Sequence, residues 1–421
     1  MASSAAVAPA DATFNQFVDR LSAQAAPACA SFREFVLALP GVLPDEALAS
    51  LMRIVGPKDA HVTRLIADAS RDSAPERLDQ GRGLPLPHPL DSEFRFDEET
   101  AERLADMLIA ATVPGDEILL VGTPSVAIAL SATTADRKIR FVGPDDCVTS
   151  AVAAAFGSDR LLLGEGSGRT ARIALVDPPW YLDPVRAMIG ACARGCALGA
   201  SVWMVVPPIG TKPEATQDRE QFLAAAVAVG LRFTGDTLPA LYRTPLFELA
   251  AMERQGIARL AAWRRGEIVG LSVAEARSIP ILAPRTRACE LSVCGVRLRL
   301  TPCALVRPFD LTPITDHEVF PSVSSRAPGR SAATLWTTGN RAFDIDAITA
   351  RAALVELSLL GDSLLQRRLT SKPNDPFADL GVAPVNRLIH QLVELIGREW
   401  DDARRLVGDG AWLETATGWR S

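Results

Sequence analysis

Short apolar runs alternate with amphipathic stretches through the middle of the chain, and this alternation predicts an α/β domain. The apolar runs have the length of buried strands, and the stretches between them repeat apolar residues at helical spacing. Strands that alternate with helices favour a mostly parallel sheet with helices on both faces. The predicted strands are Glu117–Val121, Ile139–Val142, Arg160–Leu163, Ile173–Val176 and Ala200–Val206, and the predicted helices between them are Ser125–Ser131, Val148–Phe156, Pro184–Arg194 and Arg219–Val229.

Segments on either side of this alternation complete the predicted domain. Before the first strand, Glu98–Ala111 is predicted to be an amphipathic helix, and the acidic residues in its first turn suit the helix dipole. After the last helix, Leu238–Arg243 and Leu246–Met252 are predicted to form a closing pair of strands. The periodicity therefore predicts an open α/β sheet.

The N-terminal segment has a helical pattern throughout. From Thr13 to about Ser70, apolar residues recur at helical spacing, as at Phe14 and Phe17, and they predict three or four short helices. This unit is either a winged-helix-like module or a packing and dimerisation unit. The absence of a basic recognition helix favours the second. Residues 71–95 follow as a proline-rich linker, which favours an extended segment.

A mixed C-terminal region is expected beyond residue 258. A basic helical stretch is predicted around Trp263-Arg264-Arg265, and Leu291–Leu300 alternates in the manner of a strand. Two amphipathic helices are predicted at Ile345–Leu359 and Val385–Val407. The chain is therefore divided into an N-terminal helical domain (1–83), a sheet domain (84–258) and a C-terminal α+β accessory region (259–421).

Composition narrows the classes of protein to consider. A chain of 421 residues has room for two or three domains, and its net charge of −6 argues against a surface dedicated to coating nucleic acid. We see no secretory signal and no apolar run long enough to span a membrane, so we expect a cytoplasmic protein. The seven cysteines and four histidines are scattered, with no ligand spacing between them. We therefore expect no metal site and a reducing compartment.

The segment Asp177-Pro178-Pro179-Trp180, followed by Tyr181, carries the most informative chemistry. It comes directly after the predicted strand Ile173–Val176, and its two prolines make a stiff turn because they fix φ and lack an N–H group. The Asp177 carboxylate and the Pro178 carbonyl are suited to accept both hydrogens of a planar amino group. Trp180 offers a face on which a flat ring can stack.

This Asp-Pro-Pro-Trp segment resembles motif IV of the S-adenosylmethionine-dependent amino-methyltransferases, and its tryptophan form is similar to the N6-adenine branch. The resemblance implies a Rossmann-like class I methyltransferase sheet of seven strands that ends in an antiparallel pair. It also implies S-adenosylmethionine as cofactor and methyl transfer to an amino nitrogen. Adenine N6 of a nucleic acid or nucleotide is then the first candidate substrate. The site residues that it implies are Asp177, Pro178, Pro179, Trp180 and Tyr181.

A cofactor site is expected at the carboxyl ends of the neighbouring strands, where ligands bind in open α/β sheets. The first strand ends in Gly122-Thr123-Pro124-Ser125, which has one glycine where a methyltransferase loop has two. The second is followed by Asp145 and Asp146, which either bond the ribose hydroxyls or cap the next helix. Glu165, after the third strand, either faces the adenine or belongs to a flexible glycine-rich loop.

Motif order supports a second resemblance. The cofactor loop precedes the Asp-Pro-Pro-Trp segment here, whereas the RNA-modifying N6-adenine enzymes have the opposite order. An N-terminal helical module, a proline-rich linker and then this order resemble the branched-polyamine synthases, which implies aminopropyl transfer to a polyamine as an alternative. In those enzymes an acidic run follows the first strand, and here Thr123-Pro124-Ser125 takes its place. A third alternative is a non-catalytic scaffold.

Two further features of the sequence have more than one interpretation. The loop Ile209–Thr216 is predicted either to fold over the substrate or to be an ordinary surface loop. The pair Arg264-Arg265 is suited to contact phosphates, although adjacent charges are common on a solvated surface. The expected partners are an amine-bearing substrate and, through the terminal domains, another protein or a second copy of the chain.

Overall fold

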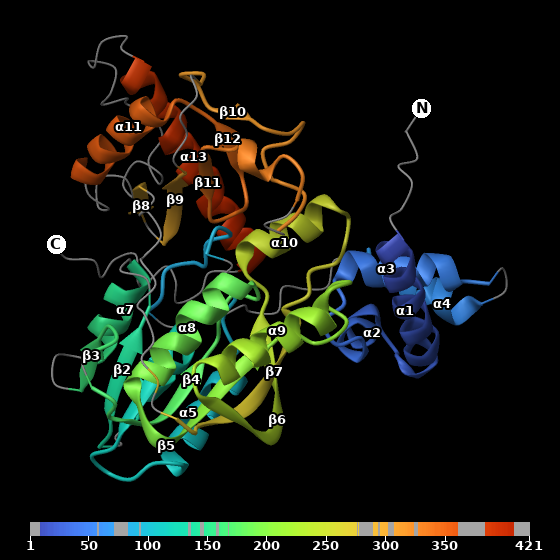
Figure 1. Ribbon diagram of the computed structural model, residues 1–421. Helices are drawn as coiled ribbons and strands as arrows, with labels where there is room; N and C mark the ends of the chain where they lie inside the picture. The colour runs from blue at the N-terminus through green and yellow to red at the C-terminus, as the bar shows by residue number, and fades with distance from the viewer. Residues whose placement is uncertain are drawn as a thin grey trace.

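The protein consists of three parts that meet around a central sheet (Figure 1). The structure, a computed structural model, describes residues 9–56, 59–70, 83–91, 94–133, 136–143, 147–156, 160–166, 168–275, 277, 289–293, 295–301, 307–323, 327–360 and 384–407. Figure 1 shows the N-terminal helices and the C-terminal region at different ends of the sheet domain. Within the described part of the chain, no helix combines the length and apolar character that crossing a membrane requires.

The central sheet has seven strands in the order β3-β2-β1-β4-β5-β7-β6. Strands β3, β2, β1, β4 and β5 pair in parallel, and β7 is antiparallel to both β5 and β6. This order confirms the Rossmann-like α/β sheet that the sequence predicts. The strands are β1 (Glu117–Val121), β2 (Lys138–Val142), β3 (Leu161–Leu163), β4 (Ala171–Val176), β5 (Cys196–Val206), β6 (Leu231–Arg243) and β7 (Ala262–Val273).

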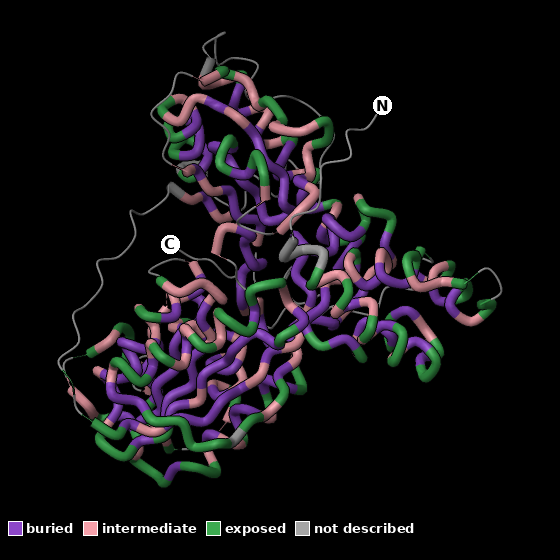
Figure 2. Tube along the Cα trace, turned by 45° about the vertical axis from the view of Figure 1, so that its right-hand side comes forward, coloured by how far each residue is buried: buried purple, intermediate pink, exposed green. Residues whose placement is uncertain are grey.

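Two layers of helices cover the sheet because its strands are apolar on both faces. Ile118 and Leu120 of β1 pack on one side, and Leu119 and Val121 pack on the other. The first layer is made by α5 (Glu98–Ala110), α6 (Pro124–Ser131) and α7 (Cys147–Phe156), and the second by α8 (Leu182–Gly195) and α9 (Ala215–Ala228). Figure 2 shows the buried backbone running continuously through this sheet. The continuous apolar runs of the sequence are thus explained by burial on both faces.

The end of the sheet domain differs from the prediction in two places. Leu246–Met252 is not a strand: it belongs to helix α10 (Leu246–Arg254), which is buried on every side and therefore shows no apolar period. The basic stretch Trp263-Arg264-Arg265 is not helical, because it lies in β7 between β5 and β6. The sheet therefore extends to Val273, beyond the predicted boundary at residue 258.

The N-terminal helices form their own core and pack against the end of the sheet domain. They are α1 (Pro9–Ala25), a short 3-10 turn η1 (Ala26–Ala28), α2 (Phe32–Ala38), α3 (Pro44–Ile54) and α4 (Ala60–Asp68). Their buried residues share one cluster with Met252, Leu260 and Trp263. The helical character predicted for this segment is confirmed, and the shared cluster fixes it against α10 and β7.

In its described residues, the C-terminal region is built on a second, antiparallel sheet against which the helices α11 (Ala347–Leu360) and α13 (Pro384–Val407) pack. Its strands β8 (Cys289–Val293), β9 (Val296–Leu300), β10 (Thr312–Pro313), β11 (Leu335–Thr337) and β12 (Ala342–Asp344) have the order β10-β12-β11-β9-β8. The short 3-10 turn η2 (Arg330–Ala332) precedes β11. Helices α11 and α13 share a core with this sheet. They confirm the two amphipathic helices that the sequence predicts. Leu291–Leu300 is a hairpin of two strands.

The linker before α5 is anchored in this C-terminal region. The Leu86 amide donates to the Gly295 carbonyl at 3.2 Å, and Arg330 Nη2 donates to the Pro89 carbonyl at 3.0 Å. Asp91 pairs with Arg297, whose side chain is fully buried and also pairs with Glu290 at 2.6 Å. Although burial opposes it, Arg297 and Arg299 hold the pKa of Asp91 at about 2. Buried charges thus tie the linker to the second sheet.

We expect the substitution Arg297→Met to lower the free energy of unfolding by about 3 kcal/mol, because it removes the fully buried one of the two arginines that Glu290 and Asp91 share and leaves Arg299 alone between them. Arg387→Met is the matched control in the same region, since Arg387 and its partner Asp310 are both largely exposed. It should change stability by less than about 1 kcal/mol. Denaturant unfolding measures both, and equal losses would contradict this account of the linker.

Candidate functional site

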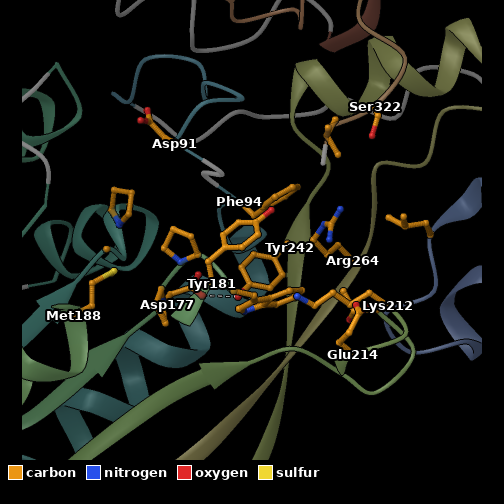
Figure 3. A pocket seen from close by; sticks show the side chains of 18 of the residues that line it. Asp91, Phe94, Asp177, Tyr181, Met188, Lys212, Glu214, Tyr242, Arg264 and Ser322 are labelled. Atoms are coloured by element: carbon orange, nitrogen blue, oxygen red, sulfur yellow. Dashed lines mark hydrogen bonds between the residues drawn. The ribbon is translucent and has the colours of Figure 1, made fainter. Parts of the chain in front are cut away.

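A cavity of about 570 Å³ opens at the carboxyl ends of β1 and β4 (Figure 3). Its walls come from all three parts of the protein: Leu43 from the N-terminal helices, Asp91 and Phe94 from the linker, and Ser322 from the C-terminal region. The sheet domain supplies the remaining walls. The Asp-Pro-Pro-Trp segment lines this cavity with all four residues, and Tyr181 follows them.

The pairing between the ends of β4 and β1 positions Asp177. Its amide donates to the Val121 carbonyl at 3.1 Å, so the residue directly after β4 lies beside the end of β1. The chain then turns through Pro178 and Pro179, and the Tyr181 amide donates to the Pro179 carbonyl at 2.6 Å before α8 begins. Because two prolines restrict this turn, the Asp177 side chain is held toward the cavity.

The side chain of Asp177 has one described hydrogen-bond partner, Tyr242 near the end of β6. The Tyr242 hydroxyl donates to Asp177 Oδ1 at 2.7 Å, which Figure 3 marks with a dashed line. Burial raises the pKa of Asp177 to about 8, and the hydrogen bond from Tyr242 opposes this rise. Burial also raises the pKa of the Tyr242 hydroxyl well above its usual value. At neutral pH the pair is therefore a protonated carboxyl next to a neutral phenol.

Aromatic rings surround this pair. Tyr242 stacks on Phe96 with ring centroids 4.9 Å apart, and it meets Phe94 and Trp180 edge-on at 6.4 and 6.1 Å. Phe94 and Trp180 line the cavity, whereas the fully buried Phe96 supports Tyr242 from behind. A flat, apolar slot next to one carboxyl group is suited to a planar amine.

Gly122 lines the cavity directly beside the backbone of Asp177. Its φ of +69° is in the left-handed region, and a Cβ added there would lie 2.3 Å from Met188 Cε and 3.1 Å from the Asp177 carbonyl oxygen. Only glycine combines this backbone conformation with so close an approach. The single glycine of the loop is therefore needed where the backbone lies close both to the cavity and to Asp177.

The remaining residues of the predicted cofactor loop lie in different surroundings. Pro124 begins α6 and lines the cavity, so it forms a wall and does not fill the space. Thr123 is buried beside it without reaching the cavity. Ser125 faces a second, smaller cavity of about 160 Å³ between α5, α6 and the linker.

Of the three acidic residues predicted for the cofactor site, Glu165 is the one that the structure describes, and it does not line this cavity. Asp145 and Asp146 lie outside the described residues, although Phe141 and Val148 on either side of them line the cavity. Glu165 lies elsewhere: both of its carboxylate oxygens accept from Arg194 at 2.7 Å. Its carboxylate is therefore satisfied by an ion pair with Arg194 in the last turn of α8 and does not require an adenine as partner.

Sequence reasoning did not identify Phe94 and Tyr242, and it marked Arg264 as suited to phosphate without placing it beside Asp177. They come from the linker and from the strands β6 and β7, which close the sheet late in the chain. One signal was available, because the chain has two tyrosines in all, Tyr181 and Tyr242, and both line this cavity. The loop Ile209–Thr216 also contributes Thr211, Lys212, Pro213 and Glu214 to the wall, on the side where a cover was expected.

The described residues offer oxygen and aromatic groups but no metal cluster. No group of three or more His, Cys, Asp and Glu is placed to hold a metal ion in the part of the chain that the structure describes. The arrangement is suited to bind and orient an amine and to exchange a proton with it through Asp177.

Comparison with known proteins gives structural likenesses only. No family model and no curated protein matches the chain. Among solved structures it is similar to the branched-chain polyamine synthase of Thermus thermophilus in complex with N4-aminopropylspermidine and 5′-methylthioadenosine. That likeness has 13% identity and a TM-score of 0.43, and it covers 63% of this chain and 89% of the synthase.

Two methyltransferases show weaker likenesses. An S-adenosylmethionine-dependent methyltransferase of Corynebacterium glutamicum is 13% identical over 41% of this chain and 87% of its own, with a TM-score of 0.29. A 16S rRNA (adenine(1408)-N(1))-methyltransferase mutant of Catenulisporales acidiphilia is 13% identical over 42% of this chain and 93% of its own, with a TM-score of 0.27. The fold itself is established by the strand order.

We expect Gly122→Ala to destabilise the protein by about 1–3 kcal/mol, because the new methyl group meets Met188 and the Asp177 backbone in an already unfavourable φ region. Gly115→Ala is the matched control: Gly115 has a φ of +86° with nothing within 4 Å of an added Cβ. Denaturant unfolding of both variants separates the close approach from the backbone strain. Equal destabilisation would show that Gly122 has no special packing role.

Proposed function

We propose that this chain is an S-adenosylmethionine-dependent methyltransferase that acts on an amino nitrogen, with adenine N6 of a nucleic acid or nucleotide as the first candidate. The single observation that carries the proposal is the placement of Asp177-Pro178-Pro179-Trp180. The segment directly follows β4, it faces Gly122 at the end of β1, and it lines one cavity with two tyrosines and Phe94. An acid with a strongly raised pKa in an apolar cavity also favours a catalytic site over a scaffold.

The cofactor end of the cavity is suited to a nucleoside with a methionine chain. Gly122 brings its bare backbone to the cavity, and Pro124, Phe141 and Val148 give apolar walls there. In this proposal Gly122 and Pro124 border the methionine part, and Phe141 and Val148 border the adenine. Bound S-adenosylmethionine supplies an electrophilic methyl group.

The protein residues hold and prepare the amine. In its ionised form Asp177 accepts a hydrogen bond from the amino group, as does the Pro178 carbonyl, while Tyr242 fixes the orientation of the carboxylate. Trp180 and Phe94 confine the ring that bears the amine and exclude water. Asp177 then takes the proton that the nitrogen loses as it gains the methyl group. The rate advantage in this arrangement comes mainly from alignment and fixed charge.

The substitution Asp177→Asn tests the proposal. The amide keeps the shape of the carboxyl group but cannot take a proton, so methyl transfer should fall by at least about 100-fold while S-adenosylmethionine still binds. Calorimetry measures cofactor binding, and transfer of a radioactive methyl group to candidate amines measures activity. Transfer at the native rate would refute the role of Asp177. If the native protein binds neither S-adenosylmethionine nor its decarboxylated form, the scaffold alternative stands.

The pH dependence of transfer gives a second test. Because ionised Asp177 is the active form, the rate should rise with pH through a pKa of about 8. The hydrogen bond from Tyr242 lowers the pKa of Asp177, so Tyr242→Phe should move the rise to higher pH. A pH–rate profile that Tyr242→Phe leaves unmoved would contradict the pairing.

The same pKa predicts how stability changes with pH. The pKa of Asp177 is about 8 in the folded protein, whereas the usual pKa of an aspartate is 3.8. Its protonated carboxyl group therefore contributes to the stability of the fold at low pH, and this contribution is lost as the pH rises between these two values. Asp177→Asn has no such loss. The melting temperature of this variant relative to the native protein should therefore increase between pH 5 and pH 9, and a constant difference would count against the raised pKa.

A further inference from the structure

The two adjacent arginines Arg264 and Arg265 have different environments in β7. Arg264 is buried, with 6% of its surface exposed, and it lines the cavity above Tyr242 (Figure 3). Arg265 is half-buried and does not line the cavity, because successive residues of a strand point to opposite faces. Of the pair that the sequence marks as suited to phosphate, one residue faces the candidate substrate.

Arg264 is held in place by three neighbours. Its Nη2 donates to Glu248 Oε1 of α10 at 2.6 Å. Its guanidinium lies 4.0 Å from the centre of the Phe94 ring and 4.7 Å from that of the Trp263 ring. A guanidinium fixed between aromatic rings keeps its remaining donors in set directions. This is the arrangement of a recognition group that is prepared before its ligand arrives.

One donor of this guanidinium lacks an acceptor. The Nε of Arg264 is buried and has no hydrogen-bond partner among the described residues. Leaving a buried charged donor without an acceptor is unfavourable, by roughly 1–3 kcal/mol. Oε2 of Glu248 is likewise buried without a described partner, so the ion pair is incomplete on both sides. An acceptor oxygen that enters the cavity and meets the guanidinium would remove the cost on the side of Arg264.

Asp91, Asp177 and Glu214 are the carboxyl groups that line the cavity, and the first two carry no free negative charge for a polycation. Asp91 is already paired with Arg297 and Arg299, and Asp177 stays protonated up to a pKa of about 8. Lys212, the second cation of the wall, is paired with Asp218. Arg264 also has one described carboxylate partner, Glu248, whose pKa burial raises, and it differs from Lys212 in that its guanidinium keeps a buried donor without a described acceptor.

We propose that Arg264 binds an anionic oxygen, of a phosphate or a carboxylate group, on the same substrate molecule whose amine Asp177 holds. This inference rests on the proposed function and specifies its substrate class: a planar amine that carries an anionic group, not a polyamine. The rings of Phe94 and Tyr242 lie between Arg264 and Asp177 and set the spacing of the two polar ends.

Two matched pairs of small amines test the proposal by calorimetric titration into the full chain with S-adenosylhomocysteine present. Adenosine monophosphate against adenosine measures the effect of a phosphate, and 4-aminobenzoate against 4-aminobenzamide measures that of a carboxylate. Spermidine is the polycation for comparison. The charged member of at least one pair should bind about tenfold more tightly than its neutral partner, as one charge-assisted hydrogen bond provides.

The variants assign this preference to Arg264. Arg264→Gln alone would leave Glu248 buried without its partner, so the test uses Arg264→Gln combined with Glu248→Gln, and circular dichroism confirms folding. The double variant should bind both members of the pair within about twofold of each other. Arg265→Gln, the matched control one residue away, should keep the native preference.

Three results would overturn the assignment: a preference that survives in the double variant, no preference in either pair with the native protein, or spermidine as the tightest of the five ligands. Failure of the proposed function is recognised separately, because S-adenosylmethionine binding is measured in its own titration without any amine. Loss of the anion preference with intact cofactor binding therefore refutes only the role of Arg264.

Discussion

The hydrogen bond from the Tyr242 hydroxyl to Asp177 joins two strand ends that are 65 residues apart in the chain, and the candidate site depends on it. It holds one carboxyl oxygen in place and leaves the other for a ligand. The same burial that makes the contact strong keeps the carboxyl protonated up to about pH 8. Ionising a carboxyl group in this buried position does not stabilise the fold, so a catalytic role explains the placement of Asp177 better than a structural role.

The cavity exists because three parts of the chain meet above the sheet. The linker carries Asp91 and Phe94 into its wall, and the buried charges of Arg297 and Glu290 fix that linker to the second sheet. The loop after β5 is held from the other side: a Cβ at Gly210 would lie 2.5 Å from the Pro40 carbonyl oxygen of the N-terminal helices. The terminal regions therefore shape the site in addition to forming their own cores.

The sequence predicted those features that depend on local pattern. Strands β1 to β5 and the stiff turn at Asp177 follow from apolar runs and prolines, which act over a few residues. Tyr242 was missed, and Arg264 was marked without its place in the site, because their positions depend on the antiparallel closure of the sheet, a long-range pairing that periodicity does not contain. Leu246–Met252 was assigned to a strand because full burial removes the helical period. Glu165 resembled a ligand in sequence, and its partner Arg194 became visible only in three dimensions.

The structure of the protein in complex with S-adenosylhomocysteine tests the central claim most directly, namely that the cofactor lies in the cavity beside Gly122 and Asp177. The account predicts density for the nucleoside beside Phe141 and Val148, with the sulfur on the side of Asp177 and the amine slot of Trp180 and Phe94 left open. A nucleoside bound anywhere else, or a cavity that stays without ligand at saturating concentration, would contradict it.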